Sequence, residues 1–90
     1  MEWGGTTMKH ATKETIEGLG DVLKGIREIP GLIEKSPGTF YRKSSAFLHF
    51  HEDPAGIFAD LKVGGEWERL RVNTAREKSA FVQRAKGSAG

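Results

Sequence analysis

The sequence IFADLKVGGEWERLRV, residues 57–72, alternates apolar and polar side chains on both sides of a Gly-Gly pair. Alternation with a period of two is typical of a β-strand that has one buried face. A Gly-Gly pair between two such runs indicates a two-residue hairpin turn, because both turn positions can require a positive φ angle. The stretch therefore predicts an antiparallel hairpin in which residues 57–63 pair with residues 66–72.

Symmetric pairing about Gly64-Gly65 assigns each side chain of this hairpin to one face of the sheet. One face is mostly apolar and is expected to contact helices; it includes Ile57, Ala59, Leu61, Leu70 and Val72, joined by Ala46, Leu48 and Phe50 from the preceding strand. The opposite face carries Phe58, Asp60, Lys62, Trp67, Arg69 and Arg71, joined by Phe47, His49 and His51. We call this second face, the one that carries Asp60, the open face, because no predicted helix covers it.

Two further strands are predicted before this hairpin, over residues 39–43 and 46–51. They are joined near Ser44-Ser45, and the loop at residues 52–56 has the composition of a turn. After the hairpin, Thr74 followed by Glu77 matches a capping box, which predicts a helix over residues 74–86.

An amphipathic helix is predicted over residues 12–29, where apolar side chains recur every three or four positions. Thr12 is the expected N-cap, and Pro30 ends the helix. Three glycines inside this helix, Gly18, Gly20 and Gly25, lower its helix propensity, and we expect Gly18 and Gly25 to permit close packing on the sheet. The predicted fold is α+β: a four-stranded antiparallel meander with both helices on one face, in the order α-β-β-β-β-α.

Length and composition limit the other possibilities. The 90 residues suit one domain, and we expect that domain at residues 10–86 with flexible tails at residues 1–9 and 87–90. The chain has no cysteine, which excludes disulfides and thiolate metal sites. Its apolar stretches are too short for a membrane span, and no signal peptide is recognisable. The sequence therefore predicts a cytoplasmic protein with no membrane partner, and a net charge of +2 does not select another partner.

The sequence His49-Phe50-His51 places two imidazoles on the same side of one strand, about 6.5–7 Å apart at the backbone. With a carboxylate from Asp60 or Glu52 they could form a three-ligand metal site. A histidine in so short a pattern more often hydrogen-bonds a neighbouring carboxylate. A metal-binding protein or metal-dependent enzyme that uses His49, His51 and Asp60 is therefore one alternative, and no cofactor is predicted.

Catalysis by a nucleophile is not favoured, because the sequence lacks a cysteine, a Gly-x-Ser-x-Gly elbow and a glycine-rich phosphate loop. Single-stranded nucleic-acid binding is another alternative. Aromatic side chains next to arginines on an open sheet can stack bases, and Phe47, Phe58 and Trp67 with Arg69 and Arg71 have this composition. The strand order differs from that of the commonest RNA-binding module and the net charge is low, so nucleic acid is not the favoured partner.

The favoured interpretation is a small binding or interaction module that uses the open face. Its predicted binding residues are Phe47, His49, His51, Phe58, Asp60, Trp67, Arg69 and Arg71. The partner would be an unidentified protein or small ligand, or a second copy of the chain bound through Trp67 and Phe58. The same residues also suit an ordinary solvated sheet face, since cross-strand pairs contribute about 0.2–1 kcal/mol each.

A set of short motifs resembles the bacterial "luciferase domain" family, whose activity is unknown. These motifs are Pro30-Gly31 with Glu34, then Phe47-Leu48-His49-Phe50-His51, Gly56-Ile57 and Asp60-Leu61. The resemblance covers about half of the chain, and the Gly-Trp and His-Pro elements that follow in the family have no counterpart here. It implies an α+β domain with His49 and His51 as the residues of interest, and it implies no light-emitting chemistry.

Overall fold

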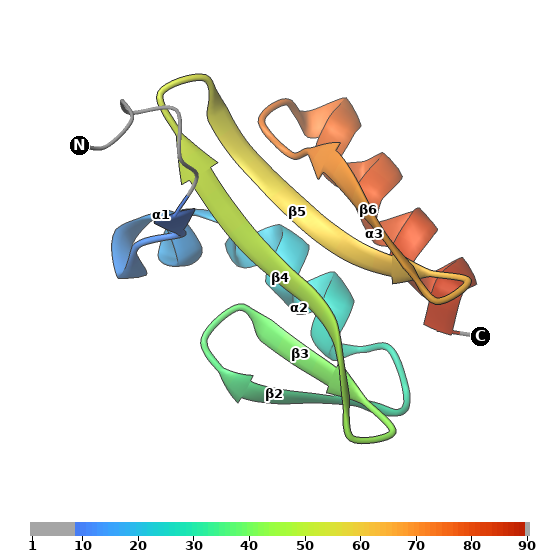
Figure 1. Ribbon diagram of the computed structural model, residues 1–90. Helices are drawn as coiled ribbons and strands as arrows, with labels where there is room; N and C mark the ends of the chain where they lie inside the picture. The colour runs from blue at the N-terminus through green and yellow to red at the C-terminus, as the bar shows by residue number, and fades with distance from the viewer. Residues whose placement is uncertain (1–8, 90) are drawn as a thin grey trace.

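The sheet is a meander of five antiparallel strands, in a computed structural model that describes residues 9–89 (Figure 1). In spatial order they are β2 (Leu32–Ser36), β3 (Thr39–Arg42), β4 (Ser45–Asp53), β5 (Gly56–Val63) and β6 (Glu66–Arg71). A two-residue strand, β1 (Lys9–His10), pairs with the C-terminal part of β4. The fold class is α+β as predicted, with the two strands β1 and β2 in addition to the four expected.

The β5–β6 hairpin has the predicted register. Phe58 pairs with Arg71, Asp60 with Arg69, and Lys62 with Trp67, while Gly64 and Gly65 have φ angles of 60° and 87°. The observed pairing therefore confirms the predicted assignment of alternate side chains to the two faces, and the positive φ angles confirm the Gly-Gly turn.

The hairpin before it differs from the prediction at two points. Its turn lies at Lys43-Ser44, one residue earlier than expected, and both residues have positive φ angles, 52° and 69°. The pairing then shifts, because Tyr41 pairs with Ala46 whereas Phe40 pairs with Leu48. This β-bulge leaves one extra residue on β4 and breaks the alternation of its side chains.

The bulge moves two residues from their predicted faces. Phe47 is buried in the same hydrophobic core as Leu48, so its predicted place on the open face is wrong. Ala46 pairs with Tyr41, on the side opposite the buried Phe40, and therefore belongs to the open face rather than to the apolar face. The consecutive apolar residues Ala46, Phe47 and Leu48 interrupt the alternation here, and the bulge is what places the last two in one core.

The predicted first helix is divided into α1 (Lys13–Gly18) and α2 (Gly20–Arg27). Leu19 between them leaves helical geometry yet is only 1% exposed, so its side chain stays in the core across the break. Thr12 caps α1 as predicted, through a hydrogen bond from the backbone N–H of Thr15. Gly18 and Gly20 flank Leu19 and have a low helix propensity. A break here therefore costs less free energy than a break among residues that favour a helix.

The expected role of the helix glycines is only partly correct. A Cβ atom added at Gly18 would meet nothing within 4 Å, so this glycine is not required by packing. A Cβ atom at Gly25 would lie 3.0 Å from Cγ1 of Val82, so Gly25 permits the close approach of a second helix rather than of the sheet.

The C-terminal helix, α3 (Ala75–Ala89), begins with the predicted capping box. The backbone N–H of Glu77 donates to the Thr74 hydroxyl, and the Glu77 carboxylate accepts from the N–H groups of Thr74 and Asn73. The helix continues beyond Lys86, so residues 87–89 are helical and not part of the expected tail. Residues 1–8 and 90 of the expected tails lie outside the described residues.

Strand β2 was not predicted, and it forms a sharp hairpin with β3. The turn at Pro37-Gly38 approaches α1 so closely that a Cβ atom at Gly38 would lie 2.6 Å from Cδ1 of Ile16. Gly38 also has a φ angle of 79°, so both its conformation and its packing favour glycine.

One face of the sheet packs on the helices, and the strands run in front of α2 and α3 in Figure 1. The side chains of this helix-covered face that are fully buried include Leu48, Ala59 and Leu61, which share one core with Ile26 of α2 and Phe81 of α3. The viewer in Figure 1 therefore faces the open face, with the helices behind the sheet. No helix in the described part of the chain is long and apolar enough to cross a bilayer.

Candidate functional site: the open sheet face

Asp60 lies at the centre of the open face and is the one charged residue buried among those described, at 7% exposure. Its position follows from the regular ladder, since Asp60 pairs with His49 on β4 and with Arg69 on β6. The helices lie on the other face, so side chains from the neighbouring strands surround this carboxylate. Its burial is therefore produced by the residues that were predicted to lie around it.

Arg69 binds the Asp60 carboxylate in a bidentate arrangement. Its Nε donates to Oδ1 at 2.7 Å and its Nη2 donates to Oδ2 at 2.9 Å. Burial by itself raises the pKa of Asp60, but the hydrogen bonds and charge of Arg69, with smaller contributions from His51 and His49, outweigh it. The pKa of Asp60 is therefore lowered, and its carboxylate is ionised at neutral pH.

Two imidazoles lie beside the same carboxylate oxygen. Nε2 of His51 is 3.0 Å from Oδ2 of Asp60, and Nδ1 of His49 is 4.0 Å from it. The rings of His49 and His51 lie edge to face with centroids 4.7 Å apart. One ligand atom from each of the three residues lies within 4.8 Å of the other two, so the predicted metal ligands converge in space.

Glu52, the other carboxylate considered for this cluster, is placed elsewhere. It pairs with Ile57 rather than with a residue of the open face, and it accepts a hydrogen bond from the backbone N–H of Thr12 at 2.7 Å. Backbone pairing also brings His10 opposite His51, so all three histidines of the chain occupy neighbouring register positions.

The aromatic residues of the open face differ in exposure. Trp67 is 45% exposed, contacts the His49 ring at a centroid distance of 4.8 Å, and lies under the Lys62 ammonium group. Phe58 is half-buried beneath the Arg71 guanidinium, which lies 5.4 Å from its ring centroid. Trp67 is therefore the predicted aromatic that offers the most surface to a ligand.

The contribution of β2 and β3 to the open face, Ile33, Lys35 and Tyr41, was missed from the sequence. Ile33 pairs with Tyr41, and the Lys35 ammonium lies 4.7 Å from the centre of the Tyr41 ring. Ile33 is 61% exposed. The sequence Leu-Ile-Glu-Lys-Ser of residues 32–36 does not alternate apolar and polar side chains, so it gives no clear strand signal, and no strand is predicted there.

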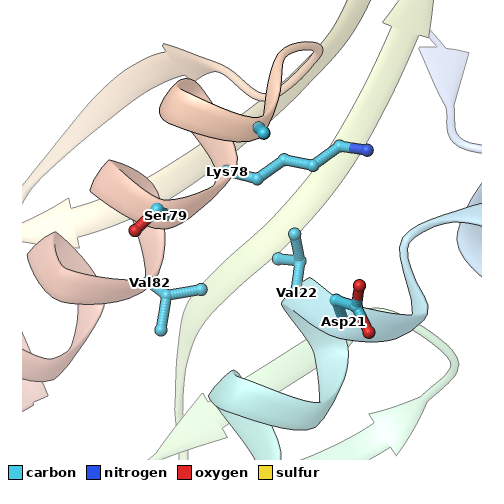
Figure 2. Close-up of a pocket in the computed structure, with 6 residues that line it drawn as sticks. Asp21, Val22, Lys78, Ser79 and Val82 are labelled. Atoms are coloured by element: carbon cyan, nitrogen blue, oxygen red, sulfur yellow. The ribbon is translucent and has the colours of Figure 1, made fainter.

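The helix-covered side has its own hollow, a space of about 310 Å³ between α2 and α3 (Figure 2). Val22 and Val82 form its apolar walls, and Lys78 extends from α3 across its mouth. Gly25 packs against Val82 in the same seam. This hollow is explained by the junction of two helices and brings together no cluster comparable to His49, His51 and Asp60.

No family profile, curated protein or solved structure matches this chain. The resemblance to the luciferase-domain family therefore stays a prediction, and the arguments for function come from the site itself.

Proposed function

We propose that this protein is a small binding module that recognises another protein through its open face. The observation that carries the proposal is the placement of exposed apolar groups. Among the described residues, the two large hydrophobic side chains that are exposed, Ile33 and Trp67, both belong to the open face. Exposed apolar and aromatic groups bordered by charge are typical of recognition surfaces.

The charges of the open face favour an acidic partner. Four cations lie on it in the part of the chain that the structure describes, Lys35, Lys62, Arg69 and Arg71. The acids of this face among the described residues are Asp53 and Asp60, and Asp60 is already bound by Arg69. Arg71 lies 3.6 Å from the Glu77 carboxylate at the start of α3. Because like charges would oppose each other across a symmetric interface, a face-to-face homodimer is less favourable than a foreign acidic surface.

Single-stranded nucleic acid is a weaker candidate for the same face. Base stacking needs accessible rings, yet Phe47 lies in the core and Phe58 is covered on one side by Arg71. One aromatic, Trp67, is left with a large accessible surface among the three predicted to stack. The remaining residues of the open face are better suited to a protein surface that carries acidic groups than to nucleic-acid bases.

The experiment is site-specific photocrosslinking in the cells that produce the protein. A photoreactive benzoylphenylalanine is placed at position 67, on the open face, or at position 79, where exposed Ser79 borders the helix-side hollow. We expect a protein adduct from position 67 and none from position 79. Combining position 67 with Arg71→Ala, which removes one cation of the face, should lower the yield of the adduct.

Several outcomes would contradict the proposal. They are equal adducts from both positions, the absence of an adduct from position 67, and an adduct that disappears on nuclease treatment. An adduct of twice the 9.9 kDa mass of the chain would identify a second copy as the partner and would contradict a foreign acidic one.

A further inference from the structure

The cluster of His49, His51 and Asp60 has the composition of a transition-metal site. Two imidazole nitrogens and one carboxylate oxygen suit zinc and other borderline divalent ions, and a three-residue set leaves a coordination position for water or another ligand. Hard ions such as Mg²⁺ and Ca²⁺ prefer sets made of oxygen. The donor atoms therefore favour a zinc-class ion over the hard cations.

The distances are close to those that such an ion requires. Zinc–nitrogen and zinc–oxygen bonds of about 2.0–2.2 Å place two tetrahedral ligand atoms about 3.3 Å apart. The separations from Oδ2 of Asp60 are 3.0 Å to His51 and 4.0 Å to His49, and all three ligand atoms lie within 4.8 Å of one another. Small side-chain rotations would bring the three atoms to equal distances from one ion.

The backbone that supports the cluster is regular. His49 and His51 are two positions apart on β4, and Asp60 pairs with His49 from the next strand. Strands β4 and β5 are both interior strands of the sheet. Ligands on such elements are held more precisely than ligands on loops.

Arg69 supports Asp60 as a ligand without occupying it fully. A carboxylate has about four acceptor positions, and Arg69 uses one on each oxygen. Metal-binding carboxylates are themselves usually hydrogen-bonded by a neighbour, which fixes their orientation. Arg69 is thus suited to be a positioning residue.

A purely structural ion pair does not require the two imidazoles. Glu34 and Arg27 form the same bidentate arrangement, with distances of 2.7 and 3.0 Å, and no histidine belongs to that pair among the described residues. Glu68 and Arg84 form a third such pair, at 2.9 and 3.0 Å. The histidines therefore distinguish the Asp60 pair from the others.

We propose that His49, His51 and Asp60 bind one divalent transition-metal ion of the zinc class, with Arg69 orienting the carboxylate. This inference is independent of the partner-binding function, because it concerns the ion alone. The proposed metal ion is a second kind of ligand for the open face, besides a protein partner.

The test is calorimetric titration of the full chain, stripped of metal by a chelator and free of affinity tags, with Zn²⁺ alone. We expect one ion per chain and an affinity at least about 100-fold weaker in a His49→Ala, His51→Ala double variant, since even the partners that orient metal ligands contribute about 10–100-fold. Mg²⁺ should not compete. His10 is kept in every variant, so that the chain's third histidine cannot explain a difference.

The matched control is Glu34→Gln, which alters the other bidentate pair. It should change zinc affinity by less than about twofold, because that pair lies on the other face and its hydrogen-bond partners, Arg27 and Gly38, do not belong to the site. Circular dichroism checks that each variant is folded, and Co²⁺ absorption gives a second readout. If the folded double variant loses affinity, Asp60→Asn should weaken Zn²⁺ binding as well and change the Co²⁺ spectrum. Absence of binding to the unmodified chain, or equal binding by the double variant, would overturn the proposal.

Discussion

Two arginine–carboxylate pairs of nearly the same geometry lie on opposite faces of the sheet, and their surroundings differ. The Arg27–Glu34 pair, on the helix-covered face, links α2 to β2, and Glu34 also accepts the backbone N–H of Gly38 at 3.0 Å. The Arg69–Asp60 pair, on the open face, joins two strands that the backbone ladder already holds together. The first pair fixes α2, β2 and the turn at Gly38 relative to one another. The second pair joins only β5 and β6, which backbone hydrogen bonds already connect.

This difference indicates where to look for function. An ion pair that connects a helix, a strand and a turn is explained by the fold. Asp60 connects little, yet it is more deeply buried and has two imidazoles beside it. The comparison predicts that stability depends mainly on the helix-covered face and that ligand binding depends mainly on the open face.

The largest expected effect is the loss of a core side chain next to Asp60 in sequence. Leu61→Ala should lower the free energy of unfolding by about 2–5 kcal/mol, because Leu61 is fully buried against the helices and its removal leaves a cavity. Urea denaturation measures the change, and half-buried Leu70→Ala is the control with a smaller expected loss. A Leu61→Ala loss below that of Leu70→Ala would contradict the deeper burial of Leu61 in the core.

The next effect is expected at Asp60 itself. Asp60→Ala should lower the free energy of unfolding by about 1.5–3 kcal/mol, the range for hydrogen bonds to charged groups. The lower end is expected, because the Arg69 side chain is half exposed and water can solvate it after the change. Urea denaturation measures this change too. A loss of unfolding free energy as large as that of Leu61→Ala would show that the open face contributes as much to stability as the core does.

A smaller effect with a characteristic pH dependence is expected at Glu34. Hydrogen bonds from Arg27 lower the pKa of Glu34 most, burial opposes them, and the Gly38 N–H adds to the lowering. A carboxyl whose pKa is lower in the folded state stabilises the protein above its unfolded pKa and loses that contribution as pH falls through the folded value.

Glu34→Gln should therefore reduce the free energy of unfolding by about 0.5–1 kcal/mol at pH 7. The difference from the unmodified chain should be constant above about pH 5 and shrink as pH falls below the ordinary glutamate value of 4.5. Denaturation at several pH values measures it. A difference that grows on acidification would contradict the assigned pKa direction.

The smallest effect on stability is expected at Trp67. Trp67→Ala removes an exposed ring and its contacts with His49 and Lys62, so the free energy of unfolding should fall by about 0.2–1 kcal/mol. The same change should abolish partner binding if the open face is the recognition surface. A stability loss above about 2 kcal/mol would instead assign Trp67 a structural role.

Local chemistry explains which elements were predictable. The Gly64-Gly65 turn fixed the β5–β6 register, and Thr74 with Glu77 marked the start of α3, because both signals act within a few residues. The convergence of His49 and Asp60 needed one more fact, the pairing of Asp53 with Gly56 across a two-residue turn. That loop was recognised as a turn, but its pairing was not assigned from the sequence.

The remaining differences arise from contacts between distant residues. Leu19 leaves helical geometry while its side chain stays in the core, and Gly38 approaches α1 through contact with Ile16. Phe47 enters the core because a bulge on β4 changes its face. The glycines beside Leu19 and the apolar run at residues 46–48 are local signs, but neither specifies the break or the bulge by itself.

The sequence by itself determined the α+β class, the last hairpin, the cap of the last helix and the alternate side chains of β5 and β6, since turn geometry and the two-residue period of a strand are local properties. Tertiary structure decided the divided helix, the bulge, the additional strands and the meeting of two imidazoles with one carboxylate. These depend on how segments far apart in the chain fill one core and align across one ladder, which local patterns do not specify.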